Sequence, residues 1–149
     1  LQSLPVMTEK ADLLALGRRV LAAQPFSVLL GAELSAFEPG RAELRLAVRG
    51  DHLQQHGFVH GGAVSYLADN ALTYAGGSTL PGLGVVTSEY KINYLRPAQG
   101  ETLIARASVL YAGKSQAVCR CDVFAVKDGV EKLCATAQGT IVPLGGAPR

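Results

Sequence analysis

The chain has 149 residues, of which 48% are hydrophobic and 17% are charged, and its formal net charge is +2 at pH 7. The length fits a single domain with a substantial core, and the low charged fraction indicates that another subunit covers part of the surface. The small net charge argues against nucleic-acid binding, and the sequence shows neither a run of 18 apolar residues nor a secretory signal pattern, so no membrane association is predicted.

The first third of the chain predicts a helix followed by a hairpin of two strands. Residues 1–6 precede the only methionine, Met7, and are interpreted as a non-native remnant or an extended start, so residues 7–149 form the predicted domain. Leucine and valine recur with a helical period up to a Gln-Pro pair, and apolar and polar residues alternate after a Glu-Pro-Gly turn. The expected elements are a helix over 10–23, an apolar connector over 26–30, and strands over 32–37 and 41–49.

The rest of the chain predicts one long helix and four strands. A polar loop over 50–57 precedes the helix, and Lys127-Asp128-Gly129 is a tight hairpin signal between the last two strands. No internal repeat and no long linker divides the chain, and residues 145–149 are expected to fray. The expected elements are a helix over 61–78 and strands over 85–94, 102–112, 116–127 and 130–142.

Three cysteines, Cys119, Cys121 and Cys134, predict free thiols rather than a disulfide framework. Their number is odd, and Cys119 and Cys121 would lie on the same face of a strand. A metal site would need further ligands at suitable spacing, and the sequence shows none. We therefore expect a cytoplasmic protein, in a reducing compartment, with no metal and no bound cofactor.

The long helix is apolar on nearly every side, yet it carries one carboxylate. Between Ala63 and Ala75 the only charged residue is Asp69, and Ser65 and Thr73 lie four residues to either side of it. These three residues form one polar stripe along the helix. A helix this apolar needs to be buried, and the only available cover is the antiparallel sheet itself. The sequence therefore predicts an α+β fold in which a curved antiparallel sheet wraps one central helix.

The segment just before the helix adds a basic group and free N–H groups. Gly61 and Gly62 follow His60, and glycines at a helix start let the first N–H groups bind a carbonyl or anionic oxygen. An unpaired carboxylate in an apolar helix is costly, so Asp69 is either functional or bonded to a neighbour. Two interpretations stay open from the residues alone. One is a hydrolytic site, and the other is an acid that bonds a nearby loop or backbone group, with His60 as a core histidine.

The motif His60-Gly61-Gly62, with Asp69 nine residues after the histidine, resembles hotdog-fold acyl-CoA thioesterases of the PaaI-like branch, named after phenylacetic acid degradation. The resemblance extends over residues 24–144. It implies a hotdog fold with an N-terminal helix, and hydrolysis of the thioester of an aryl- or medium-chain acyl-CoA. Two further segments match family elements, namely Leu95-Arg96-Pro97-Ala98 and Ala112-Gly113-Lys114-Ser115.

The resemblance implies that Asp69 is the catalytic carboxylate. It would act as a general base that activates water or as a nucleophile that attacks the thioester. Thr73, one helical turn later, matches a small hydroxyl residue that helps to place the water. Thr87 matches a similar but less regular position on the following strand.

The resemblance also assigns the groups that polarise the thioester. Gly61 would offer its backbone N–H to the carbonyl oxygen as negative charge develops, with Gly62 beside it. Gln54 matches an Asn or Gln position that supplies a second donor. His60 would orient the site or assist the departing thiolate, because an imidazole exchanges protons near neutral pH.

The active site of this family is shared between subunits. Gln54, His60 and Gly61 would come from one chain, and Asp69 and Thr73 from its partner. A two-fold interface uses each patch twice, so a dimer would hold two equivalent sites. We therefore expect a homo-oligomer, a dimer with shared sites that pairs again into a tetramer.

Two groups of residues are candidates for holding the substrate. The phosphates of CoA need cations or N–H groups, and Lys114, between Gly113 and Ser115, is the first candidate, with Arg96 second. Gly-Lys-Ser is also an ordinary turn, since the upstream glycines of a phosphate loop are missing. The acyl group would pack against apolar residues of the helix and its loop, namely Phe58, Tyr66, Leu72 and Tyr74.

Three other functions compete with this interpretation. His52, His56 and His60 are spaced by four residues, as for a metal site on a helix, but the glycines around them argue against a continuous helix. A hydratase or dehydratase also uses the hotdog fold, although its characteristic segments are absent. A non-catalytic acyl-CoA binding module would keep the cleft and would not need a base such as Asp69. Turnover, rather than binding, discriminates among these functions.

Overall fold

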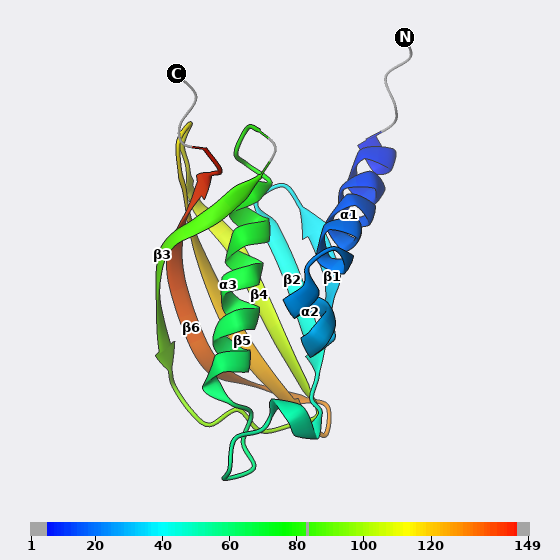
Figure 1. Cartoon of the computed structure of the whole chain (residues 1–149), viewed down its shortest axis with the longest axis vertical. Helices are drawn as coiled ribbons and strands as arrows, with labels where there is room; N and C mark the ends of the chain where they lie inside the picture. The colour runs from blue at the N-terminus through cyan, green and yellow to red at the C-terminus, as the bar shows by residue number, and fades with distance from the viewer. Residues whose placement is uncertain (1–5, 83, 146–149) are drawn as a thin grey trace.

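The computed structural model describes residues 6–82 and 84–145 (Figure 1). The segments interpreted as an extended start and a frayed end lie outside these residues, apart from Val6, which begins the first helix, and Gly145. No described helix is long and apolar enough to cross a membrane. In chain order the described elements are α1 (Val6–Ala22), α2 (Pro25–Leu30), β1 (Ala32–Glu38), β2 (Arg41–Ala47), the 3₁₀ helix η1 (Gly50–His52), α3 (Gly61–Gly77), β3 (Val85–Tyr94), β4 (Thr102–Ala112), β5 (Ala117–Lys127) and β6 (Val130–Pro143).

One antiparallel sheet of six strands curves around α3, as Figure 1 shows. The strand order is β1-β2-β4-β5-β6-β3, and each neighbouring pair is antiparallel. Leu67, Ala68 and Leu72 of α3 are fully buried in the core between helix and sheet. The predicted α+β architecture, a curved sheet around one central helix after an N-terminal helix, is therefore confirmed.

Strand alternation decides which face of the sheet meets the helix. Leu44 and Leu46 of β2 are fully buried in the core, whereas Glu43 and Arg45 alternate with them and lie on the opposite face. The same period of two appears on β5, where every second residue from Ala117 to Ala125 is buried. The hydrophobic pattern of the sequence therefore fixes the register of the sheet relative to α3.

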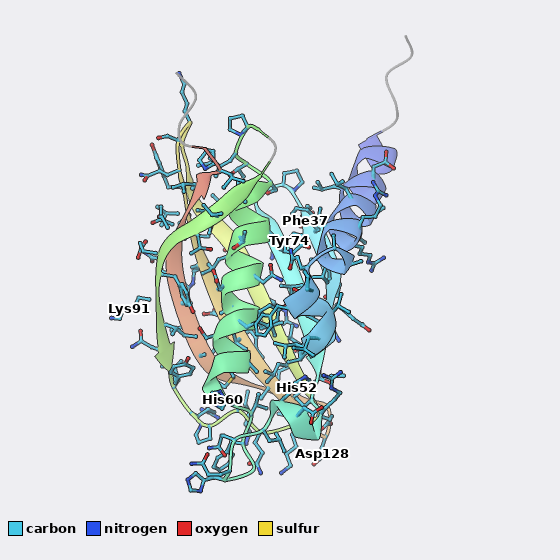
Figure 2. All side chains as sticks on the ribbon, viewed as in Figure 1. Phe37, His52, His60, Tyr74, Lys91 and Asp128 are labelled. Carbon is cyan, nitrogen blue, oxygen red and sulfur yellow. The ribbon has the colours of Figure 1, made fainter. Side chains whose placement is uncertain are left out.

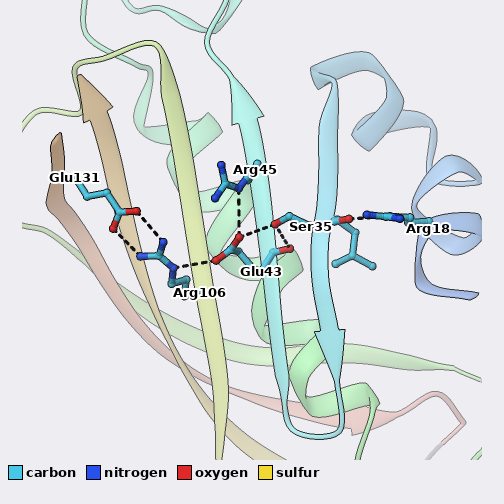
Figure 3. A network of polar contacts seen from close by, with 7 residues as sticks. Arg18, Ser35, Glu43, Arg45, Arg106 and Glu131 are labelled. Atoms are coloured by element: carbon cyan, nitrogen blue, oxygen red, sulfur yellow. Dashed lines mark hydrogen bonds and ion pairs between the residues drawn. The ribbon is translucent and has the colours of Figure 1, made fainter. Parts of the chain in front are cut away.

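The outer face of the sheet carries a polar network centred on Glu43 (Figure 3). Ser35 Oγ donates to Glu43 Oε1 at 2.8 Å, and Arg106 Nε donates to Glu43 Oε2 at 2.9 Å. Arg106 also donates through both terminal nitrogens to Glu131, each at 2.8 Å. Burial raises the pKa of Glu43, but hydrogen bonds from Ser35, Arg106 and Arg45 outweigh burial and lower that pKa. The network links β1, β2, β4 and β6 across the side of the sheet that faces away from α3.

Helix α1 packs on the edge strand β1 and is bonded to α3 through a tyrosine. Gly17 permits the close approach, because a Cβ there would lie 2.6 Å from Leu34 and 2.7 Å from Phe37. The Tyr74 hydroxyl donates to the Gly17 backbone oxygen at 2.8 Å, and the Tyr74 and Phe37 rings meet edge to face with centroids 5.2 Å apart (Figure 2). Burial raises the pKa of Tyr74 to about 12. Tyr74 is therefore a core residue that joins the two long helices.

Two segments expected to be irregular contain short helices. The predicted apolar connector is helix α2, because Pro25 fits its first turn and Gly31 closes it in a left-handed conformation at φ 84°. Within the predicted polar loop, residues 50–52 form the 3₁₀ helix. The strands agree with the prediction to within two residues at each end. Asp128 and Gly129 have φ values of 52° and 77°, which confirms the predicted tight hairpin.

The three cysteines are free and buried, in agreement with the predicted free thiols. Burial raises the pKa of Cys119 and of Cys134 to about 11, and it raises the pKa of Cys121 further. These thiols therefore stay protonated at neutral pH and are poor nucleophiles.

Candidate active site

Asp69 lies in the third turn of α3, on the polar stripe that the sheet leaves partly exposed. Its Oδ1 accepts a hydrogen bond of 2.6 Å from Thr87 Oγ1 on β3. Thr73 Oγ1 donates to the Asp69 backbone oxygen at 2.8 Å and lies 3.0 Å from Thr87 Oγ1. The structure therefore brings Asp69, Thr73 and Thr87 together. No described side chain bonds Oδ2, so one carboxylate oxygen stays open to water or substrate.

A groove of about 390 Å³ opens beside Asp69. Residues 23–27, the turn from α1 into α2, form one wall, and Tyr66 of α3 also lines it. Phe26 is 57% exposed, and its ring meets Tyr66 edge to face with centroids 5.3 Å apart. The groove thus joins an aromatic wall to a carboxylate, an arrangement that suits a ligand with an apolar group next to a reactive carbonyl.

A hydrogen-bond network fixes this wall, and of its members only Tyr66 was predicted from the sequence. Ser27 is 2% exposed, and its hydroxyl donates to Gln24 Oε1 at 2.6 Å and accepts from the Tyr66 hydroxyl at 2.5 Å. Asn70 Nδ2 donates to Gln24 Oε1 and to the Tyr66 oxygen, each at 3.2 Å. The four-residue spacing of Tyr66 and Asn70 is a signal that the sequence does contain. Gln24 and Ser27 carry no such signal.

Gln54 and Gly61 line a second cavity, of about 430 Å³, at the start of α3. Gln54 Oε1 accepts from the backbone N–H of His56 at 2.5 Å and of Phe58 at 3.3 Å, so its side-chain NH₂ is the free end of the amide. The N–H of Gly61, the first of the helix, has no partner among the described residues. The cavity therefore offers two N–H donors at the positive end of the helix macrodipole.

His60 is the N-cap of α3 and is not a core histidine. Its Nδ1 accepts from the Gly62 N–H at 2.8 Å, which requires a deprotonated ring nitrogen, and the side chain is exposed. The buried histidine is His52, whose Nδ1 accepts from the Arg49 N–H at 3.0 Å and whose Nε2 lies 2.8 Å from the Leu30 oxygen. Within the described part of the chain, no group of three or more His, Cys, Asp or Glu residues is placed to hold a metal ion.

Within one chain, the N–H donors and the carboxylate lie apart. Gly61 and Asp69 are eight residues apart on α3, which corresponds to about 12 Å along the helix axis. The cavity of Gln54 and the groove of Asp69 share no lining residue. A single chain therefore does not bring the two halves of the predicted catalytic set together.

The residues predicted to line the acyl pocket fall in three different places. Tyr66 lines the Asp69 groove, while Phe58 lines the Gln54 cavity together with Arg96, a predicted CoA contact. Tyr74 lines neither, because its ring packs in the core under α1, and Leu72 is fully buried. Of the four predicted acyl contacts, Tyr66 alone lies beside the carboxylate in the same chain.

The segment that was predicted to bind the phosphates of CoA lies far from these cavities in the same chain. Gly113, Lys114 and Ser115 form the turn between β4 and β5. These strands pair over about ten residues, so roughly 33 Å separate this turn from the other end of the hairpin. The Gln54 cavity opens beside that other end. Lys114 can therefore reach a substrate in that cavity only from another subunit.

Comparison with known proteins places the chain in a family. Residues 56–132 match the model of the thioesterase superfamily. The chain is 33% identical to the acyl-coenzyme A thioesterase PaaI of Escherichia coli over 118 residues, which cover 78% of this chain and 81% of that protein. It is also 33% identical to human acyl-coenzyme A thioesterase 13 over 103 residues, which cover 68% of this chain and 74% of that protein.

Solved structures agree with this match. A thioesterase family protein from Silicibacter pomeroyi has a TM-score of 0.80 at 38% identity, covering 85% of this chain and 93% of that one. The E. coli PaaI protein from the phenylacetic acid degradation operon has a TM-score of 0.79 at 28% identity, covering 93% of this chain and 98% of that one. The chain therefore belongs to the thioesterase superfamily, has the hotdog fold that its sequence resembles, and is a thioester hydrolase.

Proposed function

We propose that the chain hydrolyses acyl-CoA thioesters to a free acid and CoA. The placement of Asp69 carries this proposal, because one carboxylate oxygen is held by Thr87 and the other is open to the groove. A pure binding module would have no need for an acid held in this way. PaaI of E. coli and human thioesterase 13, which are similar to this chain, are named acyl-coenzyme A thioesterases. The cytoplasmic location suggested by the free thiols stays a prediction.

The complete site is proposed to form between two chains. Strand β3 ends the sheet, so one of its edges is unpaired in a single chain, and the adjoining stripe of α3 is partly exposed. A two-fold partner on this face, with its α3 antiparallel, would bring its Gly61 end towards the first chain's Asp69. The low charged fraction, 17%, supports such a covered face. The dimer is proposed to pair again into a tetramer.

In this dimer the thioester oxygen would accept hydrogen bonds from the Gly61 N–H and the Gln54 amide of one chain. Both donors gain strength as negative charge develops on that oxygen, which is how a preorganised donor pair lowers the barrier. The partner's Asp69 would lie on the other side of the carbonyl carbon, with Thr73 and Thr87 fixing its position. Asp69 Oδ2, which has no described hydrogen-bond partner, is the oxygen that would react.

Two routes use these groups. As a general base, Asp69 takes a proton from water while the water oxygen bonds to the carbonyl carbon, and collapse of the tetrahedral intermediate breaks the C–S bond. As a nucleophile, Asp69 bonds to the carbonyl carbon, the thiolate leaves, and water then cleaves the mixed anhydride. In a single turnover in ¹⁸O-water, label recovered in Asp69 would establish the nucleophilic route, because only attack of water on the Asp69 Cγ of the anhydride places label there.

The leaving group and the acyl group are assigned to opposite halves of the site. His60 uses Nδ1 to cap α3, so its Nε2 is free to donate to the departing sulfur. The acyl group would enter the Asp69 groove, where Phe26 and Tyr66 form the aromatic wall. Such a wall suits an aryl group or a medium-length alkyl chain, and we propose these as the substrate classes.

The test is thiol release from a panel of aryl-, short-, medium- and long-chain acyl-CoAs. We expect saturable release by the wild type and a loss of about 10²- to 10⁴-fold in Asp69→Asn, the range for a general base. Glu33→Gln, which removes an exposed carboxylate from β1, is the matched control and should stay fully active. Equal rates for Asp69→Asn and wild type would show that the site is wrongly assigned. No release from any member by a folded, oligomeric protein would instead favour a binding module or a hydratase.

A further inference from the structure

Three cationic side chains line a hollow of about 680 Å³ at the end of the molecule where α3 begins. They are Arg96, Lys127 and Lys132, and the one carboxylate in the lining is that of Asp128. Figure 2 shows Asp128 at the same end of the molecule as His60. No ion pair engages the three cations within the described residues. The hollow therefore carries an excess of positive charge.

Two of these cations occupy strand positions that face the core side of the sheet. On β5 alternate residues up to Ala125 are buried on the face towards α3, and Lys127 is the next residue on that face. Lys132 is the ladder partner of Ala125 on β6, so its side chain leaves the sheet on the same face. The alternation along β5 predicts apolar residues on this face, which is the face that packs against α3. Lys127 and Lys132 therefore lie on the helix-facing side of the sheet and not on its solvated outer face.

The opposite wall of the hollow is held in place by backbone contacts. Gly100 has a φ of 154°, and a Cβ there would lie 2.2 Å from the Val126 oxygen, so this approach of the loop to β5 requires glycine. The Glu101 N–H donates to the same Val126 oxygen at 2.9 Å, and the Arg96 N–H donates to the Cys134 oxygen at 3.4 Å. The loop that carries Arg96 is thus anchored at both ends to the strands that carry the lysines.

The hollow adjoins the cavity of Gln54 and Gly61. Phe58, Arg96 and Pro97 line both spaces. A ligand whose carbonyl oxygen lies at the Gly61 N–H would therefore extend towards the three cations past these shared residues. In an acyl-CoA the phosphates lie at the far end of a flexible arm from the thioester, so its anionic groups can reach the hollow while its carbonyl stays at Gly61.

We propose that this hollow binds the phosphate groups of acyl-CoA, with Lys127 and Lys132 as point charges and Arg96 as a planar donor at its entrance. The inference rests on the proposed function and adds Lys127 and Lys132 to the substrate contacts. It assigns the phosphate contacts within one chain to the β5–β6 hairpin instead of the distant turn of Lys114. Asp128 is the one lining group that opposes an anion.

The test compares one acyl group, phenylacetyl or octanoyl, on CoA and on pantetheine, which lacks every phosphate. For the double variant Lys127→Ala/Lys132→Ala we expect KM for the CoA thioester to rise about tenfold at low salt. Its kcat, and its KM for the pantetheine thioester, should stay within about twofold of wild type because neither depends on phosphate contacts. The double variant Arg41→Ala/Arg120→Ala removes the same charge elsewhere on the sheet and should leave both KM values unchanged.

An unchanged KM for the CoA thioester in the lysine variant would refute the phosphate site and leave the proposed hydrolase standing. An equal rise for both thioesters would also refute it, because such an effect does not pass through the phosphates. If the wild type hydrolyses neither thioester, the proposed function fails, and calorimetric titration with adenosine 3′,5′-bisphosphate decides the site alone. Binding that the lysine variant weakens supports the site, and binding that is absent or unchanged overturns it.

Discussion

Mixing two variants that are each expected to lose activity tests whether the donors and the carboxylate of one active site come from different chains. Asp69→Asn keeps the Gln54 and Gly61 donors and removes the acid. Gln54→Ala keeps Asp69 and removes one donor. About 12 Å of helix axis separates Gly61 from Asp69 within a chain, so neither variant can repair itself by a small rearrangement.

The expected recovery follows from the symmetry of a two-fold dimer. In a mixed dimer, one site combines the intact donors of the first chain with the intact acid of the second, and the other site carries both defects. Random exchange of equal amounts makes about half of the dimers mixed, so the mixture should reach about one quarter of wild-type activity. Each variant alone should retain about 1% or less, because losing a base or an oxyanion donor typically costs about 10²-fold or more.

The assay is thiol release from the preferred acyl-CoA, with mixed dimers isolated through two different affinity tags. Isolated mixed dimers should show about half of wild-type activity, since one of two sites is intact. A mixed dimer no more active than its parents would refute the shared site. The dimer of wild type with the double variant Gln54→Ala/Asp69→Asn is the matched control. It should be inactive if each site is shared, and half active if each chain holds its own complete site.

Three further changes test individual contacts. Thr87→Val removes the hydroxyl bonded to Asp69, the proposed catalytic carboxylate, so kcat should fall about tenfold with an unchanged melting temperature, and an unaltered kcat would contradict the proposed role of this contact. Phe26→Ala opens the aromatic wall of the groove, so kcat/KM across an acyl-CoA panel should shift about threefold to tenfold towards larger acyl groups, with Phe26→Leu as the smaller change. Glu43 has a pKa lowered below its ordinary 4.5, so its stabilisation is complete above pH 4.5 and is lost as the pH falls through the lower folded value. Urea unfolding of wild type and Glu43→Gln should therefore differ by about 1–2 kcal/mol at neutral pH and converge in acid, and a difference that persists at pH 3 would refute this reasoning.

The elements could be predicted because each depends on residues close together in the sequence. Alternation on β2 and β5 follows from strand geometry, and the Asp128-Gly129 hairpin follows from the two positive φ values that the turn requires. Helix α2 was missed because six residues are too few to show a helical period. Its Pro25 also ends the preceding helix in any local interpretation of the sequence.

The site was only partly predictable because it depends on which side of α3 the sheet leaves uncovered. Tyr66 and Tyr74 share one helix and one chemistry, yet the first lines the groove and the second bonds α1 in the core. Gln54 was found through the family resemblance alone, since no residue pattern singles it out. Lys127 did give a local signal, a cation on the core face of a strand, although its meaning needs the loop that closes the hollow around it.

The uncovered stripe of α3 is a consequence of wrapping a helix in an open sheet. A sheet has two edges, and here α1 packs against β1 while the outer edge of β3 stays unpaired among the described strands. The polar residues of α3, which are bonded to Thr87 and Tyr90 of β3, therefore lie beside that unpaired edge. A carboxylate at that position stays in contact with water in a single chain and is withdrawn from water only when a partner covers it. The donors at the start of the helix lie too far along the axis to meet the acid of their own chain. In the proposed dimer, one docking event would therefore both desolvate Asp69 and supply the donors, so catalysis by this arrangement depends on assembly.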